Sequence, residues 1–399
     1  MGTMRRLIAI LLLGLGAICT QPDGATAAPD TWTTALELME AGQTRAALPL
    51  LEQLVSAHPD NKHYRFELAL ALYRLERPFR AKWQLEQVRG ASLTPSEARL
   101  VTQFLAAIEA KSAWSGALSF EMKSESNANG QTRDRTVAAN GMQFVLRPDS
   151  RAKPGASLIT NAEIGYTQAL SEKWSGLVSL SAYVKHNEER SLRDTQLTGR
   201  AGFQYRPNQR TAFAFGLLHG NRWVADDAYS SSTGVWAEYS QLIGSRSRLN
   251  AGVEVSKIEA FTMQPDSHRT LLYGGYTLAL NGNARLDLAG YLEDTGGGLP
   301  TLTGQRAGIA ATALYAWKGG LMTSVEVSHH LDRRRGKEPF FDVAREDRKT
   351  AIALSVYHRD FRIGSFAPKL ILGAGKNQSN IPLARHDNQY LSIGLTRNF

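Results

Sequence analysis

The chain has 399 residues, a formal net charge of +9 and one cysteine, Cys19. The length allows two or three domains, and the lone cysteine, which lies in a segment expected to be removed, excludes disulfide or thiolate chemistry in the mature protein. The basic charge comes without a basic helix or an aromatic-basic motif, so nucleic acid is not expected as a partner. No apolar run reaches about 18 residues, which excludes a membrane-spanning helix.

The N-terminus predicts a secretory signal over residues 1–28. A pair of arginines, an apolar run and a small-x-small site at Ala25–Ala27 follow one another in the order typical of such signals. Lipidation of Cys19 is the less favoured alternative, because Ile18 stands where a lipoprotein signal requires a small side chain.

Residues 30–111 follow a helical period and predict a small all-α domain in the periplasm. Two units align at an offset of 34 residues, the length of a tetratricopeptide repeat. The matching positions are Ala47, Leu48 and Leu51 with Ala81, Lys82 and Leu85, and Gly42 with Glu76. Small residues at such positions allow close helix crossing, so we predict two tetratricopeptide repeats.

A closing helix is expected after the second repeat. Thr94 is its predicted N-cap, Pro95 occupies the first helical position, and Glu97 completes a capping box. An apolar stripe should cover the open side of the second repeat; its members are Leu100, Phe104, Leu105 and Ile108.

The first helix of the second repeat carries the candidate partner-binding residues of this domain. They share one helical face and are His63, Phe66, Leu70, Tyr73 and Arg74. The first helices of such repeats line a concave surface that holds an extended or helical peptide. For Phe66 and Leu70, a plain role in the core is equally compatible with the sequence.

From Trp114 to Phe399, short polar turns recur about every 37 residues and separate pairs of segments roughly ten residues long. Within these segments apolar residues alternate with small or polar ones, as Leu286 and Leu288 alternate with Asp287. A period of two predicts strands. The turns centre on Ser171–Lys173, Pro207–Gln209, Gly244–Arg246, Gly282–Asn283, Lys318–Gly320 and Arg362–Phe366.

The turns and strands predict an all-β antiparallel transmembrane barrel over residues 114–399, with fourteen strands. Strands at Gly141–Arg147 would raise the number to sixteen. Long loops are expected at 128–155, 186–192, 220–232, 259–268, 293–304, 331–346 and 376–388. Apolar side chains should face lipid, because a barrel this wide cannot fill its interior. The interior should hold polar residues such as Asp287, Glu254 and Asn250, and Trp174, Tyr205 and Trp317 should form an aromatic girdle. A soluble β-sandwich explains these even strand lengths less well.

The join between the two domains carries a resemblance to a known family. Trp114-Ser115-Gly116 opens a strand that ends in Asn127 and Asn129. A periplasmic repeat domain, this join and a fourteen-strand barrel resemble the surface lipoprotein assembly modifier family. The resemblance implies an outer-membrane protein that helps move particular surface lipoproteins, or secreted haem-carrier-like proteins, to the cell surface. Its helical domain is shorter than that of larger members.

Asn127 and Asn129 lie two residues apart, so their amides should point to one side of the strand. They are candidate partner-binding residues that latch the first strand to a neighbour or to a client strand, and a turn-forming role next to Gly130 is equally compatible.

Enzyme signals fail, and no catalytic residue, metal site or cofactor is expected. His219 has no nearby serine elbow, and His329 and His330 should face opposite ways on one strand. Gly296–Gly298 precedes no helix and cannot cradle a phosphate.

The last strand ends on Phe399, which resembles the signal read by the outer-membrane insertion machinery, with Arg397 departing from the usual apolar pattern. The expected partners are a client surface lipoprotein or secreted protein, outer-membrane lipid and lipopolysaccharide, and that machinery. We predict a secretion helper without chemistry of its own; the alternative is an outer-membrane channel, either a diffusion pore or a polysaccharide exporter.

Overall fold

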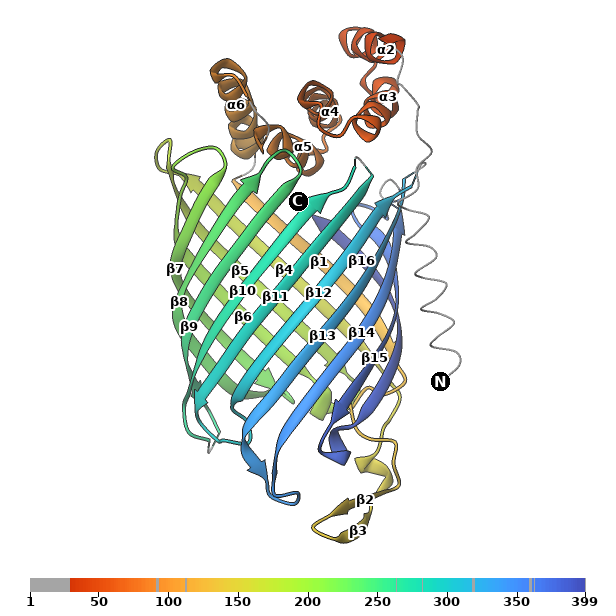
Figure 1. Ribbon diagram of the computed structural model, residues 1–399, viewed down its shortest axis with the longest axis vertical. Helices are drawn as coiled ribbons and strands as arrows, with labels where there is room; N and C mark the ends of the chain where they lie inside the picture. Colours follow the sequence, from red (N-terminus) through yellow and green to blue (C-terminus); the bar gives the residue numbers. More distant parts are fainter. Residues whose placement is uncertain are drawn as a thin grey trace.

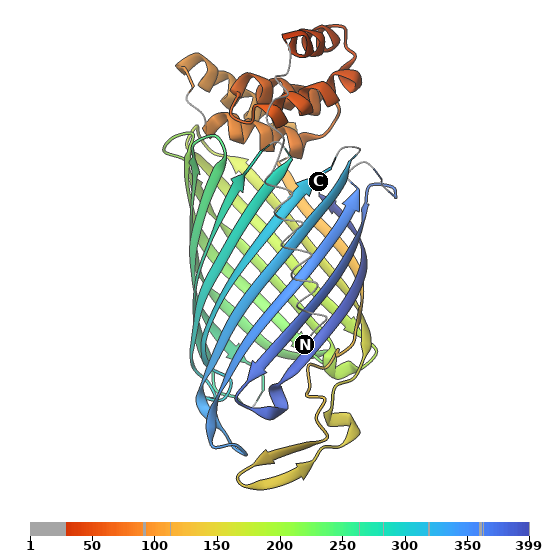
Figure 2. The same cartoon turned by 45° about the vertical axis from the view of Figure 1, so that its right-hand side comes forward.

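The computed structural model describes residues 29–90, 93–111, 113–262, 264–281, 283–317, 320–358, 361 and 363–398. Within them, five helices precede a closed antiparallel barrel of fourteen strands, and the helices stand over one mouth of the barrel (Figures 1 and 2). We call that mouth the helix end and the opposite mouth the loop end. The predicted signal over residues 1–28, Cys19 and Phe399 lie outside the described residues.

The helical unit repeats its backbone at the predicted spacing. Its helices are α2 (Pro29–Glu40), α3 (Thr44–Ala57), α4 (Lys62–Arg74), α5 (Pro78–Gly90) and α6 (Pro95–Lys111). Gly42 and Glu76, which are 34 positions apart, both adopt left-handed backbone, with φ of 73° and 56°. Leu51 and Leu85 are both fully buried. The repeat offset is therefore present in three dimensions, while assignment to the tetratricopeptide class stays a prediction.

Arg65 closes the joint between α3, α4 and α5. Its Nε donates to the Pro59 carbonyl at 2.6 Å, and its Nη1 donates to the Gln84 side-chain oxygen at 2.8 Å. The residue is 2% exposed, and burial lowers the pKa of its guanidinium to about 10, so it stays charged at neutral pH. No sequence pattern marks Arg65, because only its partners distinguish it from a surface arginine.

The capping box of α6 forms as predicted. The Thr94 hydroxyl accepts from the Glu97 amide at 3.3 Å, and the Glu97 carboxylate accepts from the Thr94 amide at 2.8 Å. Lys62 of α4 donates to the same carboxylate at 2.7 Å. Lys62 and the Thr94 amide together lower the pKa of Glu97 to about 2. The folded pKa is depressed, so this contact persists at neutral pH and is lost only as the pH falls through that value.

The apolar stripe of α6 differs from the prediction at one position. Val101, Leu105 and Ile108 are buried, and Phe104 packs against them partly buried. Leu100, by contrast, is 52% exposed, so its assignment to the covering stripe is wrong. Val101 takes its place, because the buried face is centred one residue further along the helix.

Replacing Thr94 with alanine is expected to destabilise the helical unit by about 1 kcal/mol, since one backbone donor at the start of α6 loses its acceptor. Thermal unfolding followed by far-UV circular dichroism measures this change. Gln103→Ala, an exposed mid-helix substitution, is the control. An equal shift in both variants would mean that the capping box contributes nothing specific.

The barrel strands are long and tilted (Figure 1). They are β1 (Trp114–Glu125), β4 (Gly155–Ala169), β5 (Trp174–Asn187), β6 (Asp194–Tyr205), β7 (Thr211–Val224), β8 (Asp227–Ile243), β9 (Ser247–Ala260), β10 (Ser267–Ala279), β11 (Ala284–Gly297), β12 (Gly304–Ala316), β13 (Leu321–Glu338), β14 (Val343–His358), β15 (Ala367–Ser379) and β16 (His386–Asn398). Each pairs with the next barrel strand along the chain, so that β1 pairs with β4. β1 also pairs with β16, which closes the cylinder.

The two faces of the barrel wall are as predicted. Leu288 and Leu292 of β11 are 43% and 59% exposed on the outer face. By strand alternation Asp287, Asn250 and Glu254 point inward. Glu254 is only 4% exposed, because other side chains of the interior cover it.

The six predicted short turns all connect strands at the helix end. Aromatic side chains follow that rim on the outer face: Trp174 and Tyr205 lie 4.8 Å apart, and Tyr315 and Trp317 lie 4.7 Å apart, between ring centroids. This arrangement fits the predicted girdle.

Two of the predicted long loops are wrong. In place of a loop over 220–232, β7 and β8 continue to a tight turn at Ala225 and Asp226, both with positive φ. In place of 331–346, β13 and β14 continue until only residues 339–342 remain as a turn. Both loops were predicted as connections between strands about ten residues long, but strands that project beyond a membrane remain paired in water and can be longer.

Sixteen strands exist among the described residues, and two of them lie outside the barrel. These are β2 (Thr136–Ala139) and β3 (Met142–Val145), which form a separate hairpin beyond the loop end (Figure 2). The barrel count of fourteen is thus confirmed, and the strands suspected near Gly141–Arg147 belong to this hairpin.

The β1–β16 seam is the shortest junction of the barrel. Nine described positions pair across it, from Ala117 with Asn398 to Glu125 with Tyr390. The other junctions, by contrast, pair between eleven and fifteen positions.

Candidate functional site

The barrel interior contains a network of charges on the wall formed by β6, β8, β9 and β10. Arg200 contacts Glu238 at 3.3 Å and also contacts Glu254. Arg269 reaches Glu254 at 3.1 Å, and the Tyr273 hydroxyl donates to Glu238 at 2.5 Å. Two carboxylates are therefore held by two arginines and a phenol. Such a wall offers polar groups to anything inside the barrel, beside a small buried apolar cluster that includes Leu218 and Trp236.

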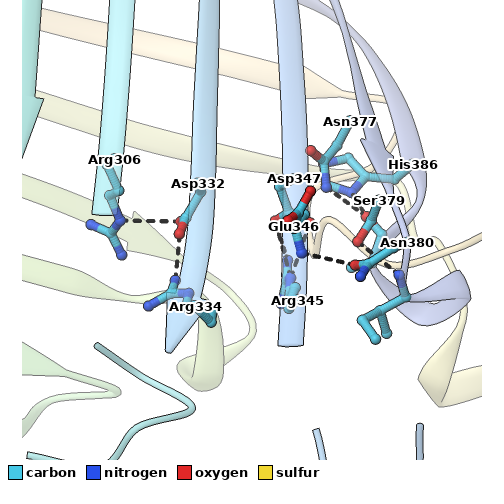
Figure 3. A network of polar contacts seen from close by, with 12 residues as sticks. Arg306, Asp332, Arg334, Arg345, Glu346, Asp347, Asn377, Ser379, Asn380 and His386 are labelled. Atoms are coloured by element: carbon cyan, nitrogen blue, oxygen red, sulfur yellow. Dashed lines mark hydrogen bonds and ion pairs between the residues drawn. The ribbon is translucent and has the colours of Figure 1, made fainter. Parts of the chain in front are cut away.

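A second polar network lies inside the barrel near the loop end (Figure 3). Asp332 accepts from Arg306 at 3.1 Å and from Arg334 at 3.2 Å. On the neighbouring strand Arg345 and Asp347 pair at 2.7 Å. Many of the charged residues between 331 and 347 are therefore held in ion pairs within the barrel wall.

The helical unit is fastened to the barrel by polar contacts with the short turns. Asp60, between α3 and α4, accepts from Arg246 at 2.9 Å and from the Ser245 hydroxyl at 3.0 Å. Asn283 donates to the Ser56 hydroxyl at 2.9 Å. Gln209 donates to the Thr102 hydroxyl of α6 at 2.9 Å. Three turns on β6 to β11 therefore support α3 and α6.

Helix α5 lies over the mouth itself. Glu86 of α5 forms an ion pair with Arg248 of β9, and the Arg285 guanidinium of β11 lies 5.7 Å from the Trp83 ring centroid. Arg248 and Arg285 belong to the inward-facing sets of their strands. Because α5 reaches inward side chains of two strands, it covers part of the opening (Figure 1).

This interface is polar and therefore weak. The side chains of the Arg246–Asp60 pair are 42% and 59% exposed, and exposed ion pairs contribute about 0–1 kcal/mol each. The Arg248–Glu86 pair is less exposed, at 26% and 15%. Polar interfaces between domains of one chain resemble transient protein interfaces, and the contacts that hold α5 over the mouth are of this kind.

The helical unit has a groove of about 550 Å³ between the first turns of α4 and α6, on which two predicted partner-binding residues lie. His63 is exposed, and Phe66 is partly buried with its ring 5.8 Å from Phe104. Six of its other lining residues are apolar or aromatic: Trp32, Tyr64, Val88, Leu93, Leu100 and Val101. The remaining four are polar or charged: Asn61, Lys62, Glu67 and Glu97. His63 and Phe66 are thus brought to one surface.

The other three predicted residues of α4 do not line this groove. Tyr73 packs edge-on against Phe104 at 5.2 Å, and Arg74 donates to the Met39 carbonyl at 2.9 Å. Leu70 packs partly buried against the core. All three make contacts within the helical unit, and binding of a partner by them stays a prediction.

Asn127 and Asn129 lie at the loop end, next to the seam and just beyond β1, which ends at Glu125 and not at Asn129 as predicted. Asn127, 2% exposed, donates through its side chain to the Gln131 carbonyl at 2.9 Å and to the Asp387 carbonyl at 3.1 Å. Asn129 donates to the Arg151 carbonyl at 2.9 Å. The asparagines therefore latch β1 to the start of β16 and hold the segment between β1 and β4.

Removing Phe399, or replacing it with a charged residue, is expected to lower the amount of inserted barrel far more than Arg397→Leu. The terminal aromatic belongs to the sequence pattern for insertion, whereas Arg397 already departs from that pattern; an arginine near the interface costs about 0–1 kcal/mol. Immunoblots of outer-membrane fractions measure the difference. Equal amounts of the two variants would contradict the prediction.

No group of three or more potential metal ligands occurs among the residues that the structure describes. His329 and His330 do face opposite ways: His329 contacts the Thr350 hydroxyl at 2.9 Å, and His330 contacts the Tyr291 hydroxyl at 3.2 Å. Among the described helices, none is long and apolar enough to cross a membrane.

These features define a class: a transmembrane β-barrel of the outer-membrane type, with a helical unit before the first strand that covers one mouth. A family model described as "Surface lipoprotein assembly modifier" matches residues 114–399, well over half of the chain. The chain therefore belongs to the surface lipoprotein assembly modifier family, an outer-membrane family of assembly modifiers that is not a known class of enzyme.

Curated relatives extend the match over most of the chain. Surface lipoprotein assembly modifier 1 of Haemophilus influenzae is 22% identical over 391 residues, covering 92% of this chain and 77% of that protein. The surface lipoprotein assembly modifier of Moraxella catarrhalis is 21% identical over 386 residues, covering 92% and 72%. Among solved structures, the outer membrane channel DcaP of Acinetobacter baumannii aligns with a TM-score of 0.42 and 8% identity, covering 72% of this chain and 96% of that one.

No sequence pattern marks the residues that join the two units. Asp60, Glu86, Arg246 and Arg248 are ordinary charged residues of loops, a helix and a strand end. A turn that contacts a partner domain has the same composition as a turn in water, so no single-sequence signal could have found them.

Proposed function

We propose that this protein assists the delivery of surface lipoproteins through or past its barrel to the outside of the outer membrane, without chemistry of its own. One observation carries the proposal: a helical unit with an apolar groove is fastened by weak polar contacts over the mouth of a barrel that has a charged interior. Family membership names surface lipoproteins as the class of client.

The orientation follows from the barrel. Short turns and both ends of the strand array lie at the helix end, and in outer-membrane barrels these features face the periplasm. The helical unit then stands in the periplasm, where a lipoprotein arrives before display. The loop end, with the β2–β3 hairpin, faces the outside.

The groove beside His63 and Phe66 receives an apolar segment of the client. Lipoproteins that have not yet folded expose such segments, and burying them against Trp32, Tyr64 and Leu100 removes apolar surface from water. One lining residue of the groove, Val88, belongs to α5, the helix that covers the mouth.

Leu100→Glu is expected to reduce client display several-fold, because the charge stands in the apolar groove while the exposed side chain of Leu100 contributes little to the core. Gln103→Glu adds the same charge to the same helix outside the groove lining and serves as the control. Protease shaving of whole cells measures display. Equal display in both variants would remove the groove from the function.

The proposal as a whole is tested by deleting the gene and measuring which proteins leave the cell surface while remaining in the cell. The expected result is loss of one or a few lipoproteins, restored by the full-length gene. An unchanged surface, together with ion conductance by the purified protein in planar bilayers, would favour the second candidate. That candidate is an outer-membrane channel, which the charged interior around Glu238 and Glu254 also suits.

A further inference from the structure

The β2–β3 hairpin projects beyond the barrel at the loop end (Figures 1 and 2). Its two-residue turn is Asn140–Gly141, with φ of 49° and 75°, as a type I′ turn requires. Isolated two-stranded hairpins are marginally stable in water. A hairpin of two four-residue strands therefore depends on contacts outside itself.

The asparagine pair supplies the first of these contacts. Asn129 donates to the Arg151 carbonyl at 2.9 Å and accepts from the Lys153 amide at 3.0 Å, so it joins the two ends of the segment that bears the hairpin. Asn127 fixes the Gln131 carbonyl and the start of β16 in the same way. The base of the hairpin is thus clamped to the barrel wall.

The short helix η3 (Pro382–Ala384) supports one strand of the hairpin. β2 lies against η3, and Val137 and Ala139 of β2 are 6% and 7% exposed. The loop bearing η3 is itself fixed from inside the barrel by Asn377, which is labelled in Figure 3. The Asn377 side chain donates to the Ala384 carbonyl at 2.8 Å. β2 is therefore covered and β3 is the outer strand.

β3 presents an unpaired edge to the outside. The Leu146 amide donates to the Arg135 carbonyl at 2.8 Å, and hydrogen-bonded pairs alternate along an antiparallel ladder. The backbone groups of Phe144 and Met142 therefore point toward β2, while those of Gln143 and Val145 point away. No other strand pairs with this edge in the part of the chain that the structure describes.

Three of the four side chains of β3 are apolar, and all three are exposed. Val145 is 82%, Met142 58% and Phe144 40% exposed. Natural proteins blunt open edges with charge, proline or a cover, and β3 has none of these within its four residues. The flanks of the hairpin, by contrast, are basic: residues 131–153 contain Arg133, Arg135, Arg147, Arg151 and Lys153 against Asp134 and Asp149.

We propose that the free edge of β3 binds a β-strand of the lipoprotein that this protein displays, by strand addition on the outer side of the membrane. The inference rests on the proposed function and specifies where the client is bound after it reaches the outer side of the membrane. Backbone groups at Gln143 and Val145 supply the hydrogen bonds of the added strand, and Val145 and Met142 supply apolar contacts. The basic flanks favour a client strand with acidic neighbours.

Lipopolysaccharide phosphates are the other ligand that basic residues at this surface could take. Binding of these phosphates would account for the arginines. It would not account for the open strand edge or for the exposed apolar side chains of β3. An added client strand accounts for the basic flanks, the open edge and the apolar side chains together, and we therefore propose a client strand as the ligand.

The test uses the full-length protein in cells, with Gln143→Pro as the variant. Proline removes the outward amide of Gln143 and leaves the bonds between β2 and β3 intact. Gln143→Ala, which keeps that amide, is the matched control. We expect Gln143→Pro to lower protease-accessible client about fivefold, the factor for losing one backbone hydrogen bond, and Gln143→Ala to leave it unchanged. The amount and heat shift of the barrel should be the same in both.

A photo-reactive p-benzoylphenylalanine at position 145 gives an independent readout. It should cross-link to the lipoprotein lost on gene deletion, whereas the same probe at Phe340, exposed on another loop-end turn, should not. Cross-linking to lipopolysaccharide alone, or normal display by Gln143→Pro, would overturn the inference and leave the proposed function standing. Display that survives gene deletion would overturn the proposed function itself.

Discussion

Deletion of residues 30–110 behind an intact signal is expected to leave a heat-modifiable barrel in the outer membrane, while client display falls to the level of the gene deletion. The barrel should fold because its backbone groups pair strand to strand around a closed cylinder, β1 with β16 included. The helical unit contributes no strand, and polar contacts such as Arg246–Asp60 attach it to the rim.

Protease shaving for the client, with total client and barrel quantified by immunoblot, measures this outcome. An absent barrel would show that the helices are needed for assembly, contrary to the two-unit description. Full display by the shortened protein would reduce the helical unit to an accessory and remove both the groove and the cover over the mouth from the function.

Locking the helical unit to the rim is expected to stop display reversibly. The pair to change is Asp60→Cys with Ser245→Cys, because these side chains are in contact at 3.0 Å. The single native cysteine, Cys19, lies within the predicted signal. A short, reducible dithiol-reactive linker then joins α3–α4 to the β8–β9 turn, so that α5 cannot leave the mouth.

Display of newly made client should fall to background in the linked protein and return after reduction. Each single-cysteine variant, treated with the same reagent, controls for modification without a link. Undiminished display by the linked protein would mean that the client does not pass the covered mouth, and the route would then have to lie outside the barrel.

Much of the barrel was predictable from the sequence because its strands and turns depend on residues that are close together in the chain. Alternation such as Leu288 with Asp287 follows from a wall that separates lipid from a polar interior. The short turns could be placed because polar and glycine-rich residues punctuate these strands. The capping box at Thr94 and Glu97 is likewise a matter of neighbouring residues.

The features that escaped prediction depend on residues far apart in the chain. The stretch 331–346 was predicted as a loop, whereas the structure pairs it as strand, with ion-pair partners such as Arg306 for Asp332 on another strand. Leu100 and Val101 differ in burial through the exact rotation of α6. The contacts of Glu86 and Asp60 with the rim join residues that are more than 160 positions apart. The roles of His63 and Phe66 remain proposals, although the structure places them in a groove.

The seam described above also fixes the order in which this molecule can be completed. One edge of β1 pairs with β4, and among the described residues its other edge pairs with β16, so the cylinder closes only when β16 is in place. The helical unit makes only local contacts within itself and can fold long before that strand arrives. Its rim partners, the turns after β6, β8 and β10, emerge midway through synthesis. The helical unit and its partners on the rim can therefore be in place before β1 and β16 pair, and each new barrel can close with its mouth already covered.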